Sequence, residues 1–199
     1  MKKTLLPIVI VLAVVAVIGV WVTNVNNRMV TYDEQVSKAW AQVENVYKRR
    51  MDLVPQLIAT VQGEADYERS TLQGIVNARS HVGQTQVDPS NLSEESVKAY
   101  QEAQDQLSSA LSRAINITVE RYPTLAATQG FRDLQVQLEG TENRIAVERA
   151  NFNEAVNAYN SVVRRFPTSL IASLLGFERK GYFTAPAGAE NPVDVKFEF

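Results

Sequence analysis

The chain has 199 residues, which is long enough for one domain with a buried core, and it contains no cysteine, which excludes disulfides, thiolate metal sites and a cysteine nucleophile. Lys2, Lys3 and Arg28 are three of its 20 Lys and Arg residues, so the chain beyond residue 29 carries 17 of these cations against 22 Asp and Glu, a net charge of about −5. This acidic balance argues against nucleic acid as a partner, because binding phosphates requires a basic surface.

The first predicted element is a membrane-spanning helix over residues 5–22, whose sequence is LLPIVIVLAVVAVIGVWV. These eighteen uncharged residues would span about 27 Å as a helix, close to the thickness of the hydrocarbon core of a bilayer. Pro7 falls in the first turn, where its missing N–H has no cost, and Trp21 lies where interfacial aromatics are common. A cleaved secretory signal is the alternative, but the length of the apolar run and the lack of an A-x-A site favour a retained anchor.

The cations that flank this span bear on its orientation. Lys2 and Lys3 directly precede it, whereas the nearest cations after it are Arg28 and Lys38. By the positive-inside rule, this spacing favours a cytoplasmic N-terminus, which would place the rest of the chain in the periplasm or outside the cell. Each flank carries two cations, so the orientation rests on their proximity to the span and on the terminal amine.

The next predicted element is a long helix between residues 32 and 61. Its apolar residues recur at alternating steps of four and three, and the same face carries Arg50. The apolar members of this series are Val36, Trp40, Val43, Tyr47, Val54, Leu57 and Val61. Pro55 removes one helical N–H and crowds the preceding turn, so we expect it to kink the helix. Gly63 should end the helix, although one bent helix running through Gly63 is the alternative.

Two further helices are predicted in the middle of the chain, within residues 64–84 and 92–121. The core candidates of the first are Leu72, Ile75, Val76 and Val82. Those of the second are Val97, Tyr100, Leu107, Leu111, Ala114 and Ile115. Asn91 followed by Glu94 resembles a capping box and predicts the start of the second helix, which Tyr122-Pro123 should end.

The last long helix is predicted from a heptad pattern that ends at Phe166. One row recurs every seven residues at Phe131, Leu138, Ile145, Phe152, Tyr159 and Phe166, and its companion row is Leu134, Thr141, Glu148, Ala155 and Val162. Helices with such faces must pack on one another, so the predicted fold is all-α: an N-terminal single transmembrane helix followed by an up-and-down four-helix bundle with long helices. Phe166-Pro167 should end this helix, and residues 170–175 should form a short helix closed by Gly176.

These elements predict three parts: an anchor at residues 1–29, a helical bundle at residues 30–183 and a flexible tail at residues 184–199. The tail is rich in Ala, Pro, Gly and Glu, which cannot bury much surface. Its last apolar residues alternate with polar ones, so they could add a strand to a partner. These residues are Val193, Val195, Phe197 and Phe199, and a frayed terminus is the alternative for them.

Several stretches of the sequence resemble the bacterial LemA family. They are AWAQVENVYKRRMDLVPQL at residues 39–57, Ala78-Arg79, YPTLAATQGFRDLQVQLEGTENRIAVERANFNEAVNAYN at residues 122–160, Pro167 and LLGFERKGYF at residues 174–183. The resemblance implies a helical bundle on an N-terminal membrane anchor, with no established enzymatic activity and no catalytic residue to carry over. Gln56, where the family favours Asn, and Phe152, where Tyr is common, depart from the family pattern.

Arg50 and Glu148 each occupy a position that is otherwise apolar along its helix. An isolated buried charge costs several kcal/mol, so we expect buried charges here to pair. The hypothesis is that Arg50 and Glu148, with Arg79 and Arg149 as further members, form a polar layer that fixes the register of the bundle. The alternative is that Arg50 extends to the surface along its stem and that Glu148 is solvated.

The sequence predicts no metal, no cofactor and no catalytic residue. A dimetal site in a four-helix bundle needs Glu-x-x-His on two helices, but position 78 before the single histidine, His81, is Ala. The Glu139-x-x-Glu142 pair alone is common on solvated helices, and the sequence has no phosphate-binding or nucleophile motif.

Function is therefore predicted to lie in binding. The expected partners are the lipid bilayer, through residues 5–22, and further copies of the chain in a homo-oligomer or another envelope protein. Ala13, Ala16 and Gly19 place small residues at three-residue steps, which favours self-association in the membrane, although lipid-facing small residues are the alternative. The competing hypothesis is an enzyme, or an accessory subunit of an envelope enzyme, that uses the Arg and Glu layer in a cleft.

Overall fold

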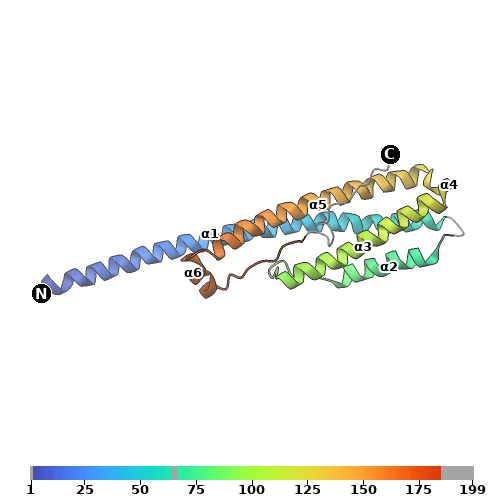
Figure 1. The fold of residues 1–199 in the computed structure, drawn as a ribbon. Coiled ribbons are helices and arrows are strands. Elements are labelled where there is room, and N and C mark those ends of the chain that lie inside the picture. The colour runs from blue at the N-terminus through green and yellow to red at the C-terminus, as the bar shows by residue number, and fades with distance from the viewer. Residues whose placement is uncertain (1, 64–66, 185–199) are drawn as a thin grey trace, which may run out of the picture.

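The computed structural model of the protein describes residues 2–63 and 67–184, with side chains from residue 7 onward. Within these residues the fold is all-α. Its helices are α1 (Lys2–Gln62), α2 (Arg69–Gln84), α3 (Glu94–Arg121), α4 (Pro123–Ala126), α5 (Gln129–Val163) and α6 (Thr168–Leu175). Helices α1, α2, α3 and α5 alternate in direction along the bundle, with α1 beside α5 and α2 beside α3 (Figure 1). The predicted fold class is thus confirmed.

Helix α1 joins the apolar N-terminal stretch to the bundle without interruption. The N-terminal part of α1, residues 2–20, extends beyond the other helices and is called the projecting half below (Figure 1). The side chains of residues 7–21 are all exposed. Among the helices that the structure describes, α1 is the one long and apolar enough to cross a membrane. Met29 is its first buried residue, so α1 enters the protein core about 10 Å beyond residue 22.

The C-terminal end of α1 lies where the sequence predicts it. The helix ends at Gln62, which confirms the break at Gly63. Pro55 lies inside α1 with an exposed side chain, and the helix continues past it to Gln62. The kink expected at Pro55 stays a prediction.

The buried apolar side chains form two clusters along the bundle. The proximal core, nearer the projecting half of α1, contains Met29, Val36, Trp40, Val43, Tyr47, Leu92, Val97, Ile145, Phe152, Val156, Tyr159, Val163, Ala172 and Phe183. The distal core contains Leu53, Val54, Leu57, Val61, Tyr67, Ile75, Val82, Ala103, Leu107, Leu111, Ala114, Leu125, Phe131, Leu134 and Leu138. Each core draws on α1, α3 and α5, so the two cores follow one another along the same helices.

Two local predictions in the middle of the chain are wrong. Helix α3 is capped by Ser93, whose Oγ accepts from the Ser96 N–H at 3.2 Å, and not by Asn91. Asn91 instead donates its backbone N–H to Asp88, which places it in the preceding turn. Val76, a predicted core residue of α2, is 46% exposed because α2 buries the face that carries Ile75.

The C-terminal predictions hold except at Phe166. Helix α5 ends at Val163, before Phe166-Pro167, so Phe166 lies beyond the heptad pattern and is 77% exposed. The short helix α6 is confirmed, and Gly176 closes it in the left-handed conformation with φ of 77°. Apart from Thr184, the predicted tail at residues 184–199 and the strand proposed near its end lie outside the described residues.

Candidate functional site

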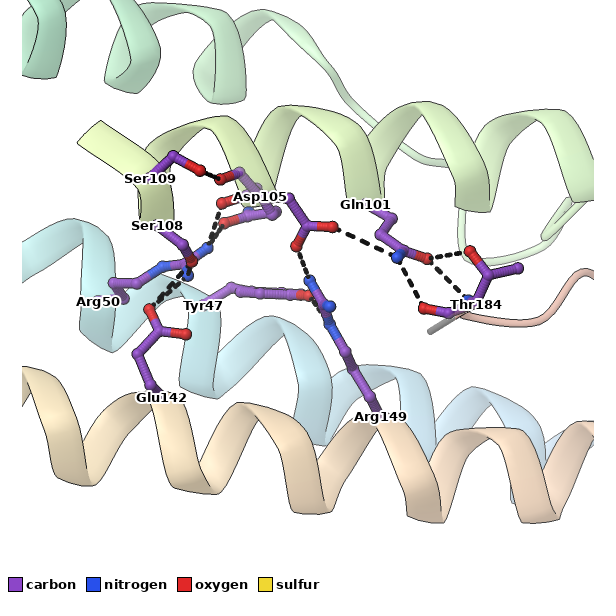
Figure 2. Close-up of polar contacts among 10 residues, drawn as sticks. Tyr47, Arg50, Gln101, Asp105, Ser108, Ser109, Glu142, Arg149 and Thr184 are labelled. Atoms are coloured by element: carbon purple, nitrogen blue, oxygen red, sulfur yellow. Dashed lines mark hydrogen bonds and ion pairs between the residues drawn. The ribbon is translucent and has the colours of Figure 1, made fainter. Parts of the chain in front are cut away.

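A layer of polar side chains crosses the bundle between the two cores (Figure 2). Its centre is Arg50 on α1, which lies between Tyr47 of the proximal core and Leu53 of the distal core. The Arg50 side chain is fully buried. A guanidinium at this depth requires compensating hydrogen bonds, because desolvating an unpaired cation costs several kcal/mol.

The contacts of Arg50 come from two other helices. Its Nη1 donates to Glu142 Oε1 on α5 at 2.7 Å and to the Ser108 hydroxyl on α3. Its Nη2 donates to the main-chain oxygen of Gln104 at 3.0 Å and to the Gln104 side-chain oxygen, both on α3. Arg50 therefore ties α1 to α3 and α5 at one level of the bundle.

A second charged group lies next to this one, towards the proximal core. Arg149 on α5 donates through Nη2 to Asp105 Oδ1 on α3 at 2.6 Å and through Nε to the Tyr47 hydroxyl on α1 at 2.5 Å. The Arg149 side chain is only 16% exposed, whereas that of Asp105 is 40% exposed. The same three helices are thus linked twice.

Tyr47 connects the two arginines. The guanidinium carbons of Arg50 and Arg149 lie 5.1 Å and 5.5 Å from the centre of its ring, within the range of cation–π contacts. Burial raises the pKa of the Tyr47 hydroxyl to about 12, and the Arg149 guanidinium opposes part of this rise. Tyr47 therefore stays neutral at physiological pH, as a hydrogen-bond acceptor for Arg149.

The polar layer continues into the C-terminal segment, residues 177–184, which runs back along the bundle after α6 without regular secondary structure (Figure 1). Gln101 on α3 accepts from the Thr184 N–H at 2.9 Å and donates to the Thr184 carbonyl at 2.9 Å. Gln101 also donates to Asp105 Oδ2 at 3.3 Å, so the C-terminal segment is connected to Arg149 through one carboxylate (Figure 2).

Two asparagines on α5 hold the C-terminal segment in the same way. Asn160 donates to the Lys180 carbonyl at 2.9 Å and accepts from the Lys180 N–H at 3.0 Å. Asn153 donates to the Phe183 carbonyl at 2.8 Å and accepts from the Phe183 N–H at 2.9 Å. These side-chain amides satisfy peptide groups that no helix or sheet satisfies. The Lys180 ammonium also pairs with Asp33 on α1 at 2.8 Å.

The polar layer reaches the surface at two places. Gln101, Asp105 and Thr184 line an open groove of about 960 Å³ between α2 and α3. The α2 side of this groove is formed by Gly74, Asn77, Ala78 and His81. Ser108 and Glu142 line a smaller pocket of about 320 Å³ between α3 and α5. Within residues 2–63 and 67–184, no group of three or more His, Asp or Glu side chains could hold a metal.

The structure brings together only some of the residues proposed for the layer. Arg50 and Arg149 lie in it, whereas the Arg79 side chain is exposed on α2. The proposed pairing of Arg50 with Glu148 is wrong: Glu142 faces Arg50, and Glu148 accepts from its neighbour Asn151 at the surface.

The helical period of α5 explains why Arg149, and not Glu148, lies in the polar layer. With 3.6 residues per turn, the face of α5 drifts relative to a strict seven-residue repeat. The companion row is therefore buried at Leu134 and Thr141 but shifts by one position to Val156 and Val163. The same shift turns Arg149 inwards in place of Glu148.

Sequence reasoning missed Gln104, Asp105 and Glu142, together with the amides that hold the C-terminal segment. One signal was present on α3, where Gln101, Gln104 and Ser108 follow Val97 at helical spacing on the face that ends at Leu111. Polar residues on an otherwise apolar face indicate an internal network, although their partners on other helices do not follow from the pattern.

Comparison with known proteins places this architecture in a family. The model of the LemA family matches residues 39–197 of the chain. The chain belongs to the LemA family. The matched region of this LemA-family protein includes Arg50, Glu142 and Arg149 as well as the C-terminal segment, and begins after the apolar part of α1.

Individual relatives of this LemA-family protein cover it to different extents. Protein LemA from Metamycoplasma hominis is 22% identical over 169 residues, which are 85% of this chain and 73% of that protein. The magnetosome proteins MamQ 1 of Paramagnetospirillum magneticum and MamQ of Magnetospirillum gryphiswaldense are 31% and 32% identical over 84 residues. Those 84 residues are 42% of this chain and only 30% of each MamQ protein.

Proposed function

We propose that this LemA-family protein is a membrane-anchored scaffold without catalytic activity, which assembles with copies of itself and presents its bundle to other envelope proteins. The observation that carries the proposal is the continuity of α1, which runs from the apolar stretch into both cores without a break. A single helix transmits position rigidly, since it has no linker that could bend freely. The bundle would therefore stand at a fixed geometry on its anchor.

The polar layer supports a structural role. Arg50 and Arg149 each bind groups on two other helices, so their contacts hold α1, α3 and α5 in one register. Polar groups buried at a single level are known to specify register in coiled coils. This use of the layer requires no substrate.

The groove between α2 and α3 supports a protein or peptide as partner. Its volume of about 960 Å³ is at the upper end of ligand sites, and it is open along its length. Its walls combine charged and apolar side chains, since Lys98, Glu102 and Arg113 line it together with Ala78 and Ala110. Such a surface suits an extended or helical polypeptide with charges of both signs.

Self-assembly would use the projecting half of α1. Ala13, Ala16 and Gly19 are exposed there, and nothing lies within 4 Å of the position that a Cβ at Gly19 would take. Small residues at such spacing allow two membrane helices to approach closely.

The test is the mass of the protein in native membrane nanodiscs, compared with a chain that lacks residues 1–22. Truncation at this point keeps Met29, which belongs to the proximal core. We expect an assembly of the full-length protein that falls to monomers on truncation. Gly19→Leu should weaken the assembly, while its neighbour Val20→Leu on another face should not. Monomers of the full-length protein would contradict self-assembly.

One observation favours a second candidate, an enzyme or the accessory subunit of an envelope enzyme. Glu142 keeps 43% of its side chain exposed and lines the pocket between α3 and α5 with Ser108. A carboxylate that contacts both a buried arginine and solvent can bind a polar substrate. Glu142→Gln would then abolish an activity without unfolding the protein, whereas the scaffold proposal expects only reduced stability.

A further inference from the structure

The exposed apolar side chains of the bundle are concentrated around α6. Outside the projecting half of α1 and the adjoining Trp21, the other exposed large apolar residues that the structure describes are valines well separated in sequence: Val30, Val76, Val119, Val136 and Val147. Around α6, by contrast, Phe166 is 77% exposed, Leu170 59%, Leu174 82% and Leu175 50%. A cluster of Phe and Leu at the surface differs from scattered valines, because it marks a contact with an apolar partner.

Helix α6 is amphipathic, which explains how these residues come to face outwards. Its inner side packs on the proximal core through Ala172 and Ile171. Leu170 and Leu174 lie one turn apart and therefore share one face of α6. The exposed face follows from how α6 is docked, and is not a frayed end.

The position of α6 in the fold indicates which partner covers the exposed face that carries Leu170 and Leu174. Helix α6 lies at the end of the bundle from which the N-terminal half of α1 projects (Figure 1). Trp21, Val25 and Arg28 of α1 line one small cavity of about 160 Å³ together with Arg165 and Thr168. Trp21 belongs to the last turn of the apolar stretch. The corner between α5 and α6 is therefore level with the predicted surface of the bilayer.

The charged side chains around the corner between α5 and α6 also fit a lipid bilayer as the partner of this face. Arg28, Arg164 and Arg165 are exposed there, and none of them forms an ion pair within the described part of the chain. Arg179, also exposed, lies farther along the chain, where it lines a depression with Asp33. Glu178, which precedes Arg179, is exposed and acidic. Arginines beside exposed Phe and Leu are typical of interfacial segments, where cations contact lipid phosphates and apolar side chains enter the acyl boundary.

We propose that the corner formed by residues 164–175 is a second membrane contact, in which Phe166, Leu170 and Leu174 insert into the same bilayer that α1 spans. Arg164 and Arg165 contact the phosphates of its lipids. The proposal rests on the retained anchor of the proposed function. Two contacts with one bilayer would fix the tilt and rotation of the bundle, which α1 alone leaves free about its own axis.

The absence of native cysteine permits a direct test with single spin labels on the full-length protein. Leu174→Cys carries the label of interest, Val136→Cys on α5 is the water-exposed control, and Val15→Cys is the reference within the span. Both Leu174 and Val136 are mostly exposed, at 82% and 67%, so the label should disturb neither site. The protein is reconstituted in vesicles of phosphatidylcholine and phosphatidylglycerol, and the accessibility of each label to oxygen and to a water-soluble nickel chelate is measured.

We expect the ratio of oxygen to nickel accessibility at Leu174 to exceed that at Val136 several-fold and to approach that at Val15. The double variant Arg164→Gln, Arg165→Gln should shift the Leu174 label towards water. Equal ratios at Leu174 and Val136, with Val15 in the membrane, would overturn the proposal and leave the anchor intact. A Val15 label in water would overturn the anchor itself. Shielding of the Leu174 label from both reagents that increases with protein density would assign the face to a second copy, which also overturns the proposal.

Discussion

Arg50 Nη1 on α1 lies 2.7 Å from Glu142 Oε1 on α5, although 92 positions separate the two residues in the sequence. The pair lies at the boundary between the proximal and distal cores, where Arg50 is fully buried and Glu142 keeps 43% of its side chain exposed. Because of this difference in burial, removing Arg50 and removing Glu142 should lower the free energy of unfolding by different amounts.

Replacing the buried partner should be the more damaging change. Arg50→Ala leaves Gln104, which is 1% exposed, without its donors and opens a cavity, so we expect a loss of about 3–5 kcal/mol in the free energy of unfolding. Glu142→Gln removes the counter-charge of Arg50 but keeps an acceptor and access to water, so its cost should be smaller, about 1.5–3 kcal/mol. Urea unfolding of the full-length protein in detergent, followed by circular dichroism, measures both. Equal losses would show that the burial of Arg50 does not decide its importance.

The stability of the bundle should fall at alkaline pH through Tyr47. Its hydroxyl ionises near pH 10 in the unfolded chain and at about 12 in the folded protein. Between these values the folded state keeps a proton that the unfolded state has released, so stability decreases as pH rises, by up to about 1.4 kcal/mol per pH unit. Tyr47→Phe should flatten this slope between pH 10 and 12 when unfolding is measured at several pH values. An unchanged slope would contradict the assignment to Tyr47.

The attachment of the C-terminal segment to α5 should depend on the side chain of Asn160. Asn160→Ala removes both hydrogen bonds to the peptide groups of Lys180, each of which contributes about 1 kcal/mol. We expect hydrogen exchange at the Lys180 amide to accelerate roughly 5- to 30-fold, as for local opening made easier by 1–2 kcal/mol. Asn157→Ala, an exposed position on the same helix, is the control and should leave this amide protected.

Two glycines should respond oppositely to alanine. At Gly181 a Cβ would lie 2.6 Å from Glu94 Cα and 2.8 Å from the Ser93 carbonyl oxygen, so Gly181→Ala must displace the C-terminal segment from α3. We expect a loss of about 1–3 kcal/mol. At Gly140 within α5, a Cβ would meet nothing within 4 Å, so Gly140→Ala should stabilise the protein by about 0.5–1 kcal/mol. Thermal unfolding of the two variants, measured in parallel with the unchanged protein, gives the two changes in stability. Stabilisation by Gly181→Ala would contradict the close packing of Gly181 on α3.

The sequence by itself determined the helices and the long apolar stretch at the N-terminus. Hydrophobic periodicity, together with the breaks at Gly63, Pro123 and Pro167, depends only on near neighbours, so the long helices and their buried faces could be predicted from it. The apolar run of residues 5–22 likewise predicts a candidate membrane-spanning helix by length and composition alone.

Only the tertiary structure decided which polar groups meet. The face of α5 rotates by the small difference between 3.6 residues per turn and a seven-residue repeat, which exchanges Glu148 for Arg149. Glu142 meets Arg50 across the bundle, and that contact depends on how α1 and α5 are placed against each other. The return of residues 177–184 along the bundle depends on contacts between distant segments, and so does the position of α6 beside the end of the apolar stretch. Such contacts are set by how helices rotate and shift against one another, which no local pattern encodes.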